Sequence, residues 1–575
     1  IDTAVEMMNE YFTIDPTIQS KLEAGTHYYL PAPENPGDTA TGWQTEKPNA
    51  DSATMFENHT WMDEYNPSEV YDEEFLSLSQ GTVGVVFLGR VGGESNDVYH
   101  GQNGAYADGS QHELQLNEYE KETIRLAKAN CDQVVVVLET SNVMEISELA
   151  AEDGELAVDA IVWVGGAGAK GFRGLAEVLC GEVNPSGHLP DTWMSSILDD
   201  PTSANFGEYL YTNVEYNGLT QAMVEYDEGI YMGYRYYETV NDLNGSFTVN
   251  GSTLPYGELD ENGAVTTAGA VVYPFGYGLS YGTEFDQKIL DVTQEDGQVT
   301  VTVQVTNSGT QAGKDAVQLY YTAPYTDLDV QYGIEKSTVN LLAYAKTGDI
   351  PAGGSETVTL TFNLEDMASY SYQHENFDGT LGCYMLEGGD YTLSVRADSH
   401  NVFDQTTVQV EETIWYDGSD EDHIRQSEKD AQDTAGGGEE AETYYAATNQ
   451  FQESNDHMLA KTDTLTRASG KLVNTAQSPT AEDLVAPDGL LEQVYTAQYF
   501  DPETDESLGN GETSLVYAET APTTNADNGL VLSDLRGVAY DDPLWDELLD
   551  QLDLSQSSDV WQTLLASCYT VGAFS

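Results

Sequence analysis

A short, almost unbroken apolar run at residues 83–88 is the feature that most restricts the fold of this chain. Apolar runs of this length are typical of parallel strands buried on both faces. The run breaks into GRVGGES (residues 89–95), whose glycine pair allows a sharp turn and close approach of another molecule. In open α/β sheets, ligands bind where loops leave the carboxyl ends of strands. We therefore expect a functional loop directly after this strand.

Glu94 is the residue that this loop would present, and Arg90 precedes it by four positions. A carboxyl group at a strand end can transfer protons to and from a bound substrate. We predict that Glu94 is a general acid/base and that this chain supplies half of an active site. The pattern alone favours a simpler interpretation, in which the glycines form an ordinary turn and the glutamate is a solvated side chain.

Two more apolar runs, residues 133–139 and 160–164, alternate with a helical pattern at 116–129. Strands that alternate with helices predict a parallel sheet covered on both sides. The glycine-rich run 165–171 matches a dinucleotide-binding loop only loosely, because no early strand places it as the first strand–helix turn. We interpret it as a tight turn into a helix at 175–180, and a nucleotide-binding α/β protein stays the third hypothesis for function.

Further along the chain, the hydrophobic period changes to two. Residues 298–306 (QVTVTVQVT), 357–362 and 390–395 alternate apolar and polar side chains. Short alternating strands separated by Gly, Asn and Pro turns predict a β-sandwich of immunoglobulin or fibronectin type. Residues 418–470 are rich in Asp, Glu, Gln, Ser and Gly, which indicates a linker or a draped segment. Residues 541–552 predict an amphipathic helix with proline near its start.

The charge balance excludes several classes of partner. The chain has 20 Lys and Arg against 99 Asp and Glu, a formal net charge of −79. Such a chain repels phosphate backbones and anionic lipid surfaces, so we expect no nucleic acid partner. No apolar run approaches the roughly 20 residues that span a bilayer, so we expect no membrane insertion in this segment. A neutral ligand such as a sugar is compatible with this charge, and the 37 tyrosines could provide flat faces for sugar rings.

The four cysteines, Cys131, Cys180, Cys383 and Cys568, lie far apart and show neither zinc-site nor disulfide-framework spacing. We expect them to be small buried side chains, and we predict no metal and no cofactor. The chain begins directly in a helical pattern and stops shortly after a helix, so we expect a piece of a longer polypeptide. Lys/Arg depletion and long polar loops favour a bacterial extracellular or cell-surface location, with a cytoplasmic location as the alternative.

Five segments, in order, resemble glycoside hydrolase family 3, whose members are β-glucosidase-like enzymes. They are GRVGGES, residues 116–142, residues 158–193 with an NPSG-x-LP signature at 184–190, YDEGIYMGYRYYET and YPFGYGLSY. Two later segments, GKDAVQLYYTAP and EGGDYTLSVRADSHN, resemble the fibronectin type III-like domain of such enzymes. The segment LSDLRGVAYDDPLWDELLDQL looks like the opening of the family's (β/α)8 barrel. A β-sandwich that precedes the barrel resembles a subgroup with reversed domain order.

The resemblance implies four parts. They are an α/β/α sandwich with a mostly parallel sheet over residues 1–285, a fibronectin type III-like β-sandwich over 286–412, an acidic linker or insertion over 413–530, and the beginning of the catalytic (β/α)8 barrel over 531–575. The rest of the barrel, with the family's aspartate nucleophile, would lie outside this chain. Ser95 departs from the family pattern, because the loop often has glycine there.

The resemblance also implies the chemistry, which is retaining, exo-acting hydrolysis of terminal β-linked sugars by two carboxyl groups about 5–5.5 Å apart. It makes Glu94 the acid/base, with Arg90, Gly93 and Asp97 as substrate-binding or loop-supporting residues. Glu228, within YDEG, is the runner-up acid/base, and a buried structural contact is its alternative role. His100 and His112 lie in polar loops and are assigned no role.

The expected partners are an oligosaccharide or aryl glycoside, as in polysaccharide degradation, and a catalytic barrel from the rest of the polypeptide or a second chain. A homo-oligomer is possible in such a family. The second hypothesis for function is a non-catalytic carbohydrate-binding or cell-surface scaffold protein that retains the fold.

Overall fold

The computed structural model describes most of residues 73–90, 112–435, 443–452, 464–486 and 523–552, together with four two-residue strands elsewhere. The chain forms two compact units, residues 1–491 and 492–575, which are described separately. Among the described residues, no helix combines the length and the apolar character needed to cross a bilayer.

The first sheet of the larger unit has three parallel strands. Its strands, in spatial order, are β3 (Val83–Gly89), β4 (Gln133–Glu139) and β5 (Ala160–Trp163). Val83 lies opposite Gln133, and Val135 lies opposite Ala160. Both faces of the central strand are covered, since Val136 and Val137 are fully buried. The prediction of parallel strands from continuous apolar runs is thereby confirmed.

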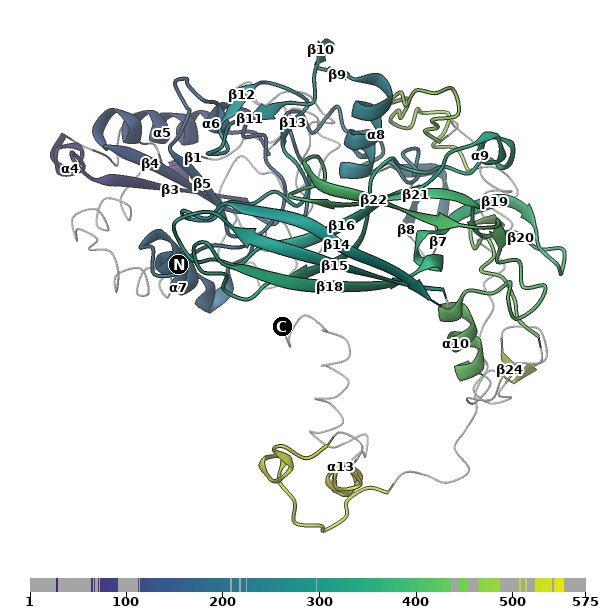
Figure 1. Cartoon of the computed structure of the whole chain (residues 1–575). Coiled ribbons are helices and arrows are strands. Elements are labelled where there is room, and N and C mark those ends of the chain that lie inside the picture. Colours follow the sequence, from purple (N-terminus) through teal and green to yellow (C-terminus); the bar gives the residue numbers. More distant parts are fainter. Residues whose placement is uncertain are drawn as a thin grey trace. The chain divides into compact units, whose positions relative to one another are not determined.

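Helices cover the two faces of this sheet (Figure 1). Helix α5 (Glu118–Asn130) packs so closely that a Cβ placed on Gly84 of β3 would lie 2.9 Å from Sγ of Cys131, directly after the helix. On the opposite face, Phe172 of α7 (Gly168–Leu179) contacts Phe87, with ring centroids 6.3 Å apart. Because α7 begins at Gly168, part of the glycine-rich run lies inside the helix. Packing against the sheet outweighs the cost of about 1 kcal/mol that each helical glycine carries.

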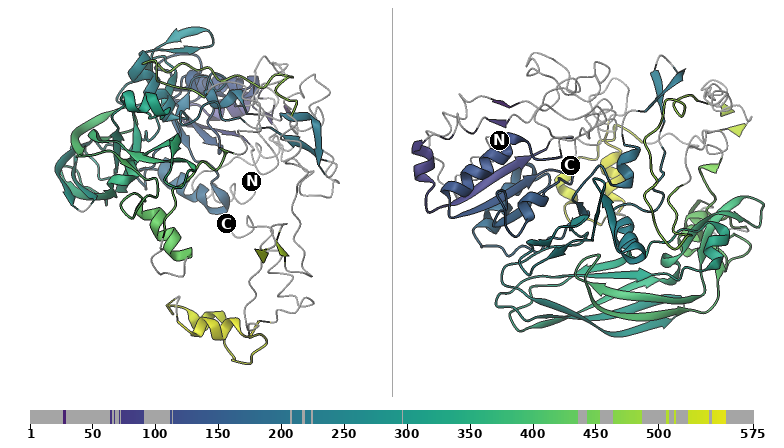
Figure 2. Two further views of the ribbon diagram at one scale, coloured as in Figure 1. Left: turned by 90° about the vertical axis from the view of Figure 1, so that its right-hand side faces the viewer. Right: turned by 90° about the horizontal axis from the view of Figure 1, so that it is seen from above.

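The alternating segments form a β-sandwich, whose long strands run side by side in the right-hand view of Figure 2. One antiparallel sheet consists, in order, of β14 (Phe285–Glu295), β15 (Gln298–Asn307) and β18 (Ser355–Asn363). The other consists of β17 (Asn340–Lys346), β16 (Ala316–Thr322), β21 (Gly389–Arg396) and β22 (Val402–Val410).

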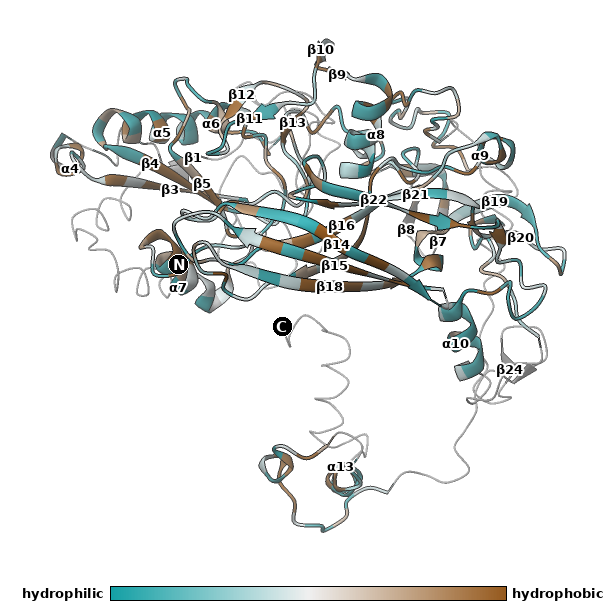
Figure 3. Ribbon diagram, viewed as in Figure 1, coloured by the Kyte–Doolittle hydropathy of each residue, from teal (hydrophilic) through white to brown (hydrophobic). Residues whose placement is uncertain are grey.

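The core of the sandwich follows from the period of two. In β15 the inward residues Val299, Val301, Val303 and Val305 are all fully buried, and they pack with residues of the second sheet such as Leu393. Figure 3 shows hydrophobic residues along the strands, whereas helix α10 (Gln426–Ala435) is mostly hydrophilic. Each fully buried valine contributes on the order of 1.5–3 kcal/mol.

The remaining helices and strands are short. The helices are α4 (Glu73–Leu78), α6 (Ser147–Ala150), α8 (Tyr234–Asn244), α9 (Asp327–Tyr332) and, in the smaller unit, α13 (Leu544–Leu549). In sequence between β5 and β14 come β6 (Trp193–Met194), β7 (Leu210–Tyr216), β8 (Leu219–Ala222), β9 (Phe247–Val249), β10 (Ser252–Leu254), β11 (Glu258–Leu259), β12 (Val265–Thr267) and β13 (Val271–Tyr273). The larger unit also contains β1 (His27–Tyr28), β2 (Glu64–Tyr65), β19 (Ser369–Glu375), β20 (Leu381–Leu386) and β23 (Ile414–Trp415), and the smaller unit contains β24 (Glu506–Ser507) and β25 (Glu512–Thr513).

Two sequence expectations differ from these observations. The helix expected over 541–552 is shorter, because Pro543 caps it and α13 ends at Leu549. Of the cysteines in the described part of the chain, Cys383 is buried, but Cys131 is half-buried and Cys180 is exposed at the end of α7. Cys568 lies outside the described residues.

Part of the expected linker packs onto the aromatic-rich region of the larger unit. Leu465 and Leu472 are buried beside Tyr231 and Tyr237. The backbone N–H of Leu465 donates to the carbonyl of Asp227 at 2.7 Å. Residues 464–486 are therefore a packed segment rather than a free connection.

Helix α8 joins the aromatic-rich region to the sandwich through a buried carboxylate. Glu238 accepts hydrogen bonds from the hydroxyls of Tyr256 (2.6 Å) and Ser399 (3.0 Å), and its other oxygen lies 2.9 Å from Nδ1 of His400. The His400 ring stacks on Tyr256, with centroids 3.9 Å apart. Burial lowers the pKa of His400, but its hydrogen bond to Glu238 and the charges of Glu238 and Asp398 outweigh burial and raise the pKa.

His400→Gln is expected to destabilise the protein by about 1 kcal/mol at pH 6, the scale of one hydrogen bond. A raised folded-state pKa stabilises the fold below the unfolded pKa of about 6.5 and loses that contribution as pH rises through the folded value. The deficit of the variant should therefore shrink by pH 9 in urea unfolding.

His374→Gln is the matched control. Burial lowers the pKa of His374, so its replacement should not weaken the protein more at pH 6 than at pH 9. A deficit of His400→Gln that stays constant with pH would contradict the assignment of His400 as a protonated partner of Glu238.

Candidate functional site

The carboxyl ends of the three parallel strands form the edge at which the sequence predicts a functional loop. The ladder between β3 and β4 continues past the strand end, since the backbone N–H of Arg90 donates to the carbonyl of Glu139 at 3.2 Å. Nε1 of Trp163, the last residue of β5, donates to the carbonyl of Thr140 at 2.7 Å. The strand ends are thus tied together across the whole edge.

Of the predicted site residues, Arg90 and Glu228 are described by the structure. Gly93, Glu94 and Asp97 lie outside the described residues. The geometry at this edge therefore rests on Arg90, which directly precedes residues 91–111, and on residues 112–120, which follow them.

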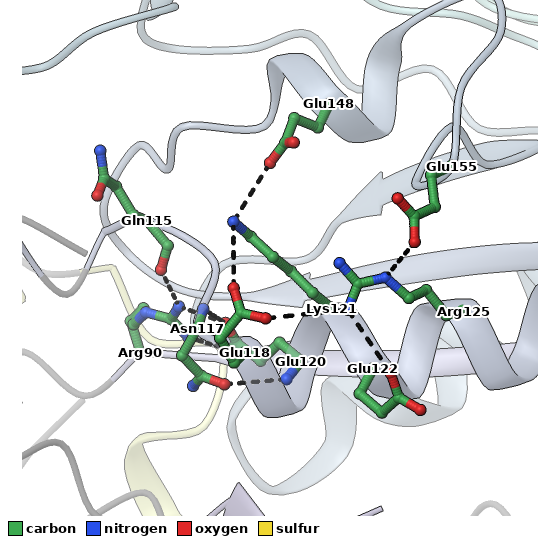
Figure 4. Close-up of polar contacts among 10 residues, drawn as sticks. All are labelled: Arg90, Gln115, Asn117, Glu118, Glu120, Lys121, Glu122, Arg125, Glu148 and Glu155. Carbon is green, nitrogen blue, oxygen red and sulfur yellow. Dashed lines mark hydrogen bonds and ion pairs between the residues drawn. The ribbon is translucent and has the colours of Figure 1, made fainter. Parts of the chain in front are cut away.

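Arg90 makes a buried, two-pronged ion pair with Glu120 of α5 (Figure 4). Nη1 of Arg90 lies 2.5 Å from Oε1 of Glu120, and Nη2 lies 2.9 Å from Oε2. The guanidinium also donates to the carbonyls of Gly89 (2.7 Å) and Gln115 (2.8 Å). Its side chain is 8% exposed and that of Glu120 is fully buried. Bidentate pairs of this kind fix both side chains in one orientation.

The first turn of α5 explains why Glu120 is available for this pair. Asn117 caps the helix, because its Oδ1 accepts the backbone N–H of Glu120 at 2.9 Å. In return, Oε2 of Glu120 accepts the backbone N–H of Asn117 at 2.8 Å. This reciprocal arrangement is a capping box, which satisfies helix N–H groups and favours a negative charge at the helix start.

A second carboxylate, Glu145, continues the polar network. It accepts hydrogen bonds from Nε2 of Gln115 (2.7 Å) and from the backbone N–H of Ile197 (2.7 Å), and it lies 3.0 Å from Nε2 of His112. Burial raises the pKa of Glu145, but these hydrogen bonds and the charge of His112 outweigh burial and lower it. The lowered pKa favours the ionised form of Glu145.

Glu228 lies in a different part of the fold, in the loop before α8. It is 5% exposed, and among the residues that the structure describes its Oε2 has no hydrogen-bond partner. Burial, followed by the charges of Asp227 and Asp200, raises its pKa. The pKa of Asp200 is raised by burial as well. Both the structural and the acid/base interpretations of Glu228 stay predictions.

The outer face of α5 borders an open hollow of about 370 Å³. Lys121 lies 3.5 Å from Glu148, and Nε of Arg125 lies 2.6 Å from Glu155 on the facing loop. Figure 4 shows these pairs on the side of the helix away from Arg90. Partly exposed pairs of this kind are worth about 0–1 kcal/mol, so we interpret them as surface contacts. In the described part of the chain, no group of three His, Cys, Asp or Glu side chains could hold a metal ion.

Sequence reasoning missed most of this network. The capping box had a readable signal, because Asn117 and Glu120 have the N-x-x-E spacing of a helix start. His112, which was expected in a polar loop, is fully buried. No local pattern indicates that Glu145 would meet His112, since 33 residues separate them.

Glu228→Gln separates a structural role from a proton-transfer role. A carboxyl group whose pKa is raised on folding destabilises the fold increasingly as pH rises through the range between its unfolded and folded values. We expect the variant to be more stable than the parent at pH 8, by on the order of 1 kcal/mol, and equal to it at pH 4. Thermal unfolding at both pH values measures this. Lower stability of Glu228→Gln at pH 8 would contradict an unpaired buried carboxylate.

Comparisons with known proteins give the chain its relatives. The family model described as glycosyl hydrolase family 3 C-terminal domain matches residues 9–234. β-Glucosidase A of Butyrivibrio fibrisolvens is 30% identical over 312 residues, which are 52% of this chain and 32% of that protein. A β-glucosidase of Ruminococcus albus is 28% identical over 365 residues, which are 64% of this chain and 31% of that protein.

A solved structure of a β-glucosidase from Paenibacillus barengoltzii aligns with a TM-score of 0.46 at 31% identity, over 60% of this chain and 32% of that one. The chain spans about a third of the length of the two curated relatives that it matches. The matched segment holds the parallel sheet, Arg90 and Glu228. Residues 9–234 therefore resemble the C-terminal domain of glycosyl hydrolase family 3, and the chain is similar to β-glucosidases over about a third of their length.

Proposed function

We propose that this chain is the acid/base-bearing part of a retaining, exo-acting glycoside hydrolase that releases terminal β-linked sugars. The observation that carries the proposal is that β3 ends at Gly89, at the carboxyl edge of a parallel sheet inside the family-matched segment, four positions before the sequence reaches Gly93 and Glu94. Ligands collect at such edges. The relatives named above, which are β-glucosidases, favour a β-glucoside as substrate.

Glu94 has the acid/base role in this proposal. It protonates the leaving oxygen in the first step and removes a proton from water in the second, while a carboxylate on the barrel forms the bond to the sugar. An acid of this kind needs a raised pKa, which desolvation or a nearby carboxylate provides. The barrel face would supply both, so the pKa of Glu94 should be closer to its ordinary value when the barrel is absent.

The proposal extends to the order of the domains and to the location of the protein. Residues 531–575 would begin the (β/α)8 barrel after the β-sandwich, as in the subgroup with reversed order, and the rest of the barrel would come from the same polypeptide or a second chain. The mostly polar character of α10 and the net charge of −79 suit a bacterial extracellular or cell-surface location. The substrate is an oligosaccharide or an aryl glycoside.

Hydrolysis of an aryl β-glucoside by the full-length protein tests the assignment. Glu94→Ala should lower kcat by about 10²–10⁴-fold, the usual contribution of general acid/base catalysis. Azide should restore turnover, because this small anion attacks the glycosyl-enzyme without needing a base. Glu228→Gln is the comparison variant and should retain most activity.

Three outcomes would contradict the proposal. Unchanged hydrolysis by Glu94→Ala excludes Glu94 as the acid/base. A large loss in Glu228→Gln, reversed by azide, transfers the role to Glu228. Sugar binding without any hydrolysis by the parent protein identifies a non-catalytic carbohydrate-binding protein.

A further inference from the structure

We propose that Glu120 is a positioning residue for the reaction: it acts through Arg90 on the place at which the candidate acid/base is held. This inference rests on the proposed function and deepens it. Glu120 is assigned no contact with the substrate. Its role comes from the contacts that it and Arg90 make at the two ends of residues 91–111.

The guanidinium of Arg90 joins chain positions on both sides of that stretch. On one side, the backbone of Arg90 is fixed to β4 through the carbonyl of Glu139. On the other side, Nη2 of Arg90 donates to the carbonyl of Gln115 at 2.8 Å. Residues that are 25 positions apart in sequence are thereby bridged by one planar group.

Glu120 determines where that planar group lies. Both of its oxygens face the guanidinium, and the same carboxylate closes the capping box with Asn117. Arg90 is thus attached to the first turn of α5, because its partner Glu120 is itself fixed by the capping box. Because the pair is buried, loss of one partner leaves an uncompensated charge, which typically costs 3–5 kcal/mol.

The bridge matters for catalysis because an acid must meet the leaving oxygen within hydrogen-bond distance. Glu94 lies only four positions after Arg90 in the sequence, so we expect a shift at Arg90 to displace the start of the segment that carries the candidate acid. A misplacement of about 1 Å can lower a rate by 10²-fold. A positioning role therefore predicts a selective defect in acid catalysis, distinct from a loss of folded protein.

Leaving-group dependence in the full-length protein separates these two effects. The 2,4-dinitrophenolate group departs from its β-glucoside without being protonated. The more basic phenolate group of phenyl β-glucoside must be protonated by the acid as it departs. Glu120→Gln should lower kcat/KM for phenyl β-glucoside more than for 2,4-dinitrophenyl β-glucoside, by on the order of ten-fold or more. A smaller folded fraction lowers both values equally and leaves their ratio unchanged.

The controls use the same helix and the same loop. Glu122→Gln removes an exposed partner of Arg125 on the outer face of α5 and should leave the ratio unchanged. Arg90→Lys keeps the charge but loses the two-pronged geometry, and it should change the ratio in the same direction as Glu120→Gln if the latter folds poorly. Glu94→Ala should show the largest selective loss.

The outcomes distinguish the two proposals. A changed ratio in Glu94→Ala but unchanged ratios in Glu120→Gln and Arg90→Lys overturn the positioning role and leave the function intact. An unchanged ratio in Glu94→Ala overturns the function.

Hydrogen–deuterium exchange tests the positioning role without measuring activity. In Glu120→Gln, peptides from residues 91–111 should exchange faster than in the parent, while the exchange of peptides from β4 stays unchanged. Equal exchange in both proteins also contradicts the positioning role.

Discussion

The scarcity of cations is the constraint that shapes the interior of this protein. With 20 Lys and Arg against 99 Asp and Glu, few buried carboxylates can find a basic partner. Arg90 is one of these cations, and it lies at the end of the edge strand, between Glu120 and the carbonyl of Gln115. Lys336 is another, since its Nζ lies 2.7 Å from Asp329 and also contacts Glu387. Both cations hold segments that are distant in sequence.

Other buried carboxylates are paired with hydroxyl groups and a histidine, or have a raised pKa. Glu238 accepts the hydroxyls of Tyr256 and Ser399, which joins the aromatic-rich region to the sandwich. Burial raises the pKa of Asp315 to about 6. A raised pKa favours the neutral form of a buried carboxyl group, which costs less to bury than the charged form. An acidic chain can thus build a core without an equal number of bases.

The same physics connects the fold to the proposed reaction. A retaining hydrolase needs one carboxyl group that is protonated at working pH and placed against the leaving oxygen. Residues 91–111 carry the candidate group, and the described residues that precede and follow them in sequence are held by the β3–β4 ladder, the capping box of α5 and the hydrogen bonds of Glu145. A catalytic group that is held in the correct geometry reacts faster than one that must first reach it.

Sequence alone determined the elements whose signal is local. The apolar runs predicted β3, β4 and β5, and the alternation at 298–306 predicted β15, because burial on one or two faces imposes a period that can be read residue by residue. The family motifs likewise lie in continuous segments. Tertiary structure alone decided that Arg90 meets Glu120, that His112 is buried against Glu145, and that residues 464–486 pack onto the aromatic region. These contacts join residues from 30 to more than 200 positions apart, and a buried charge finds its partner only when the whole chain has brought the two together.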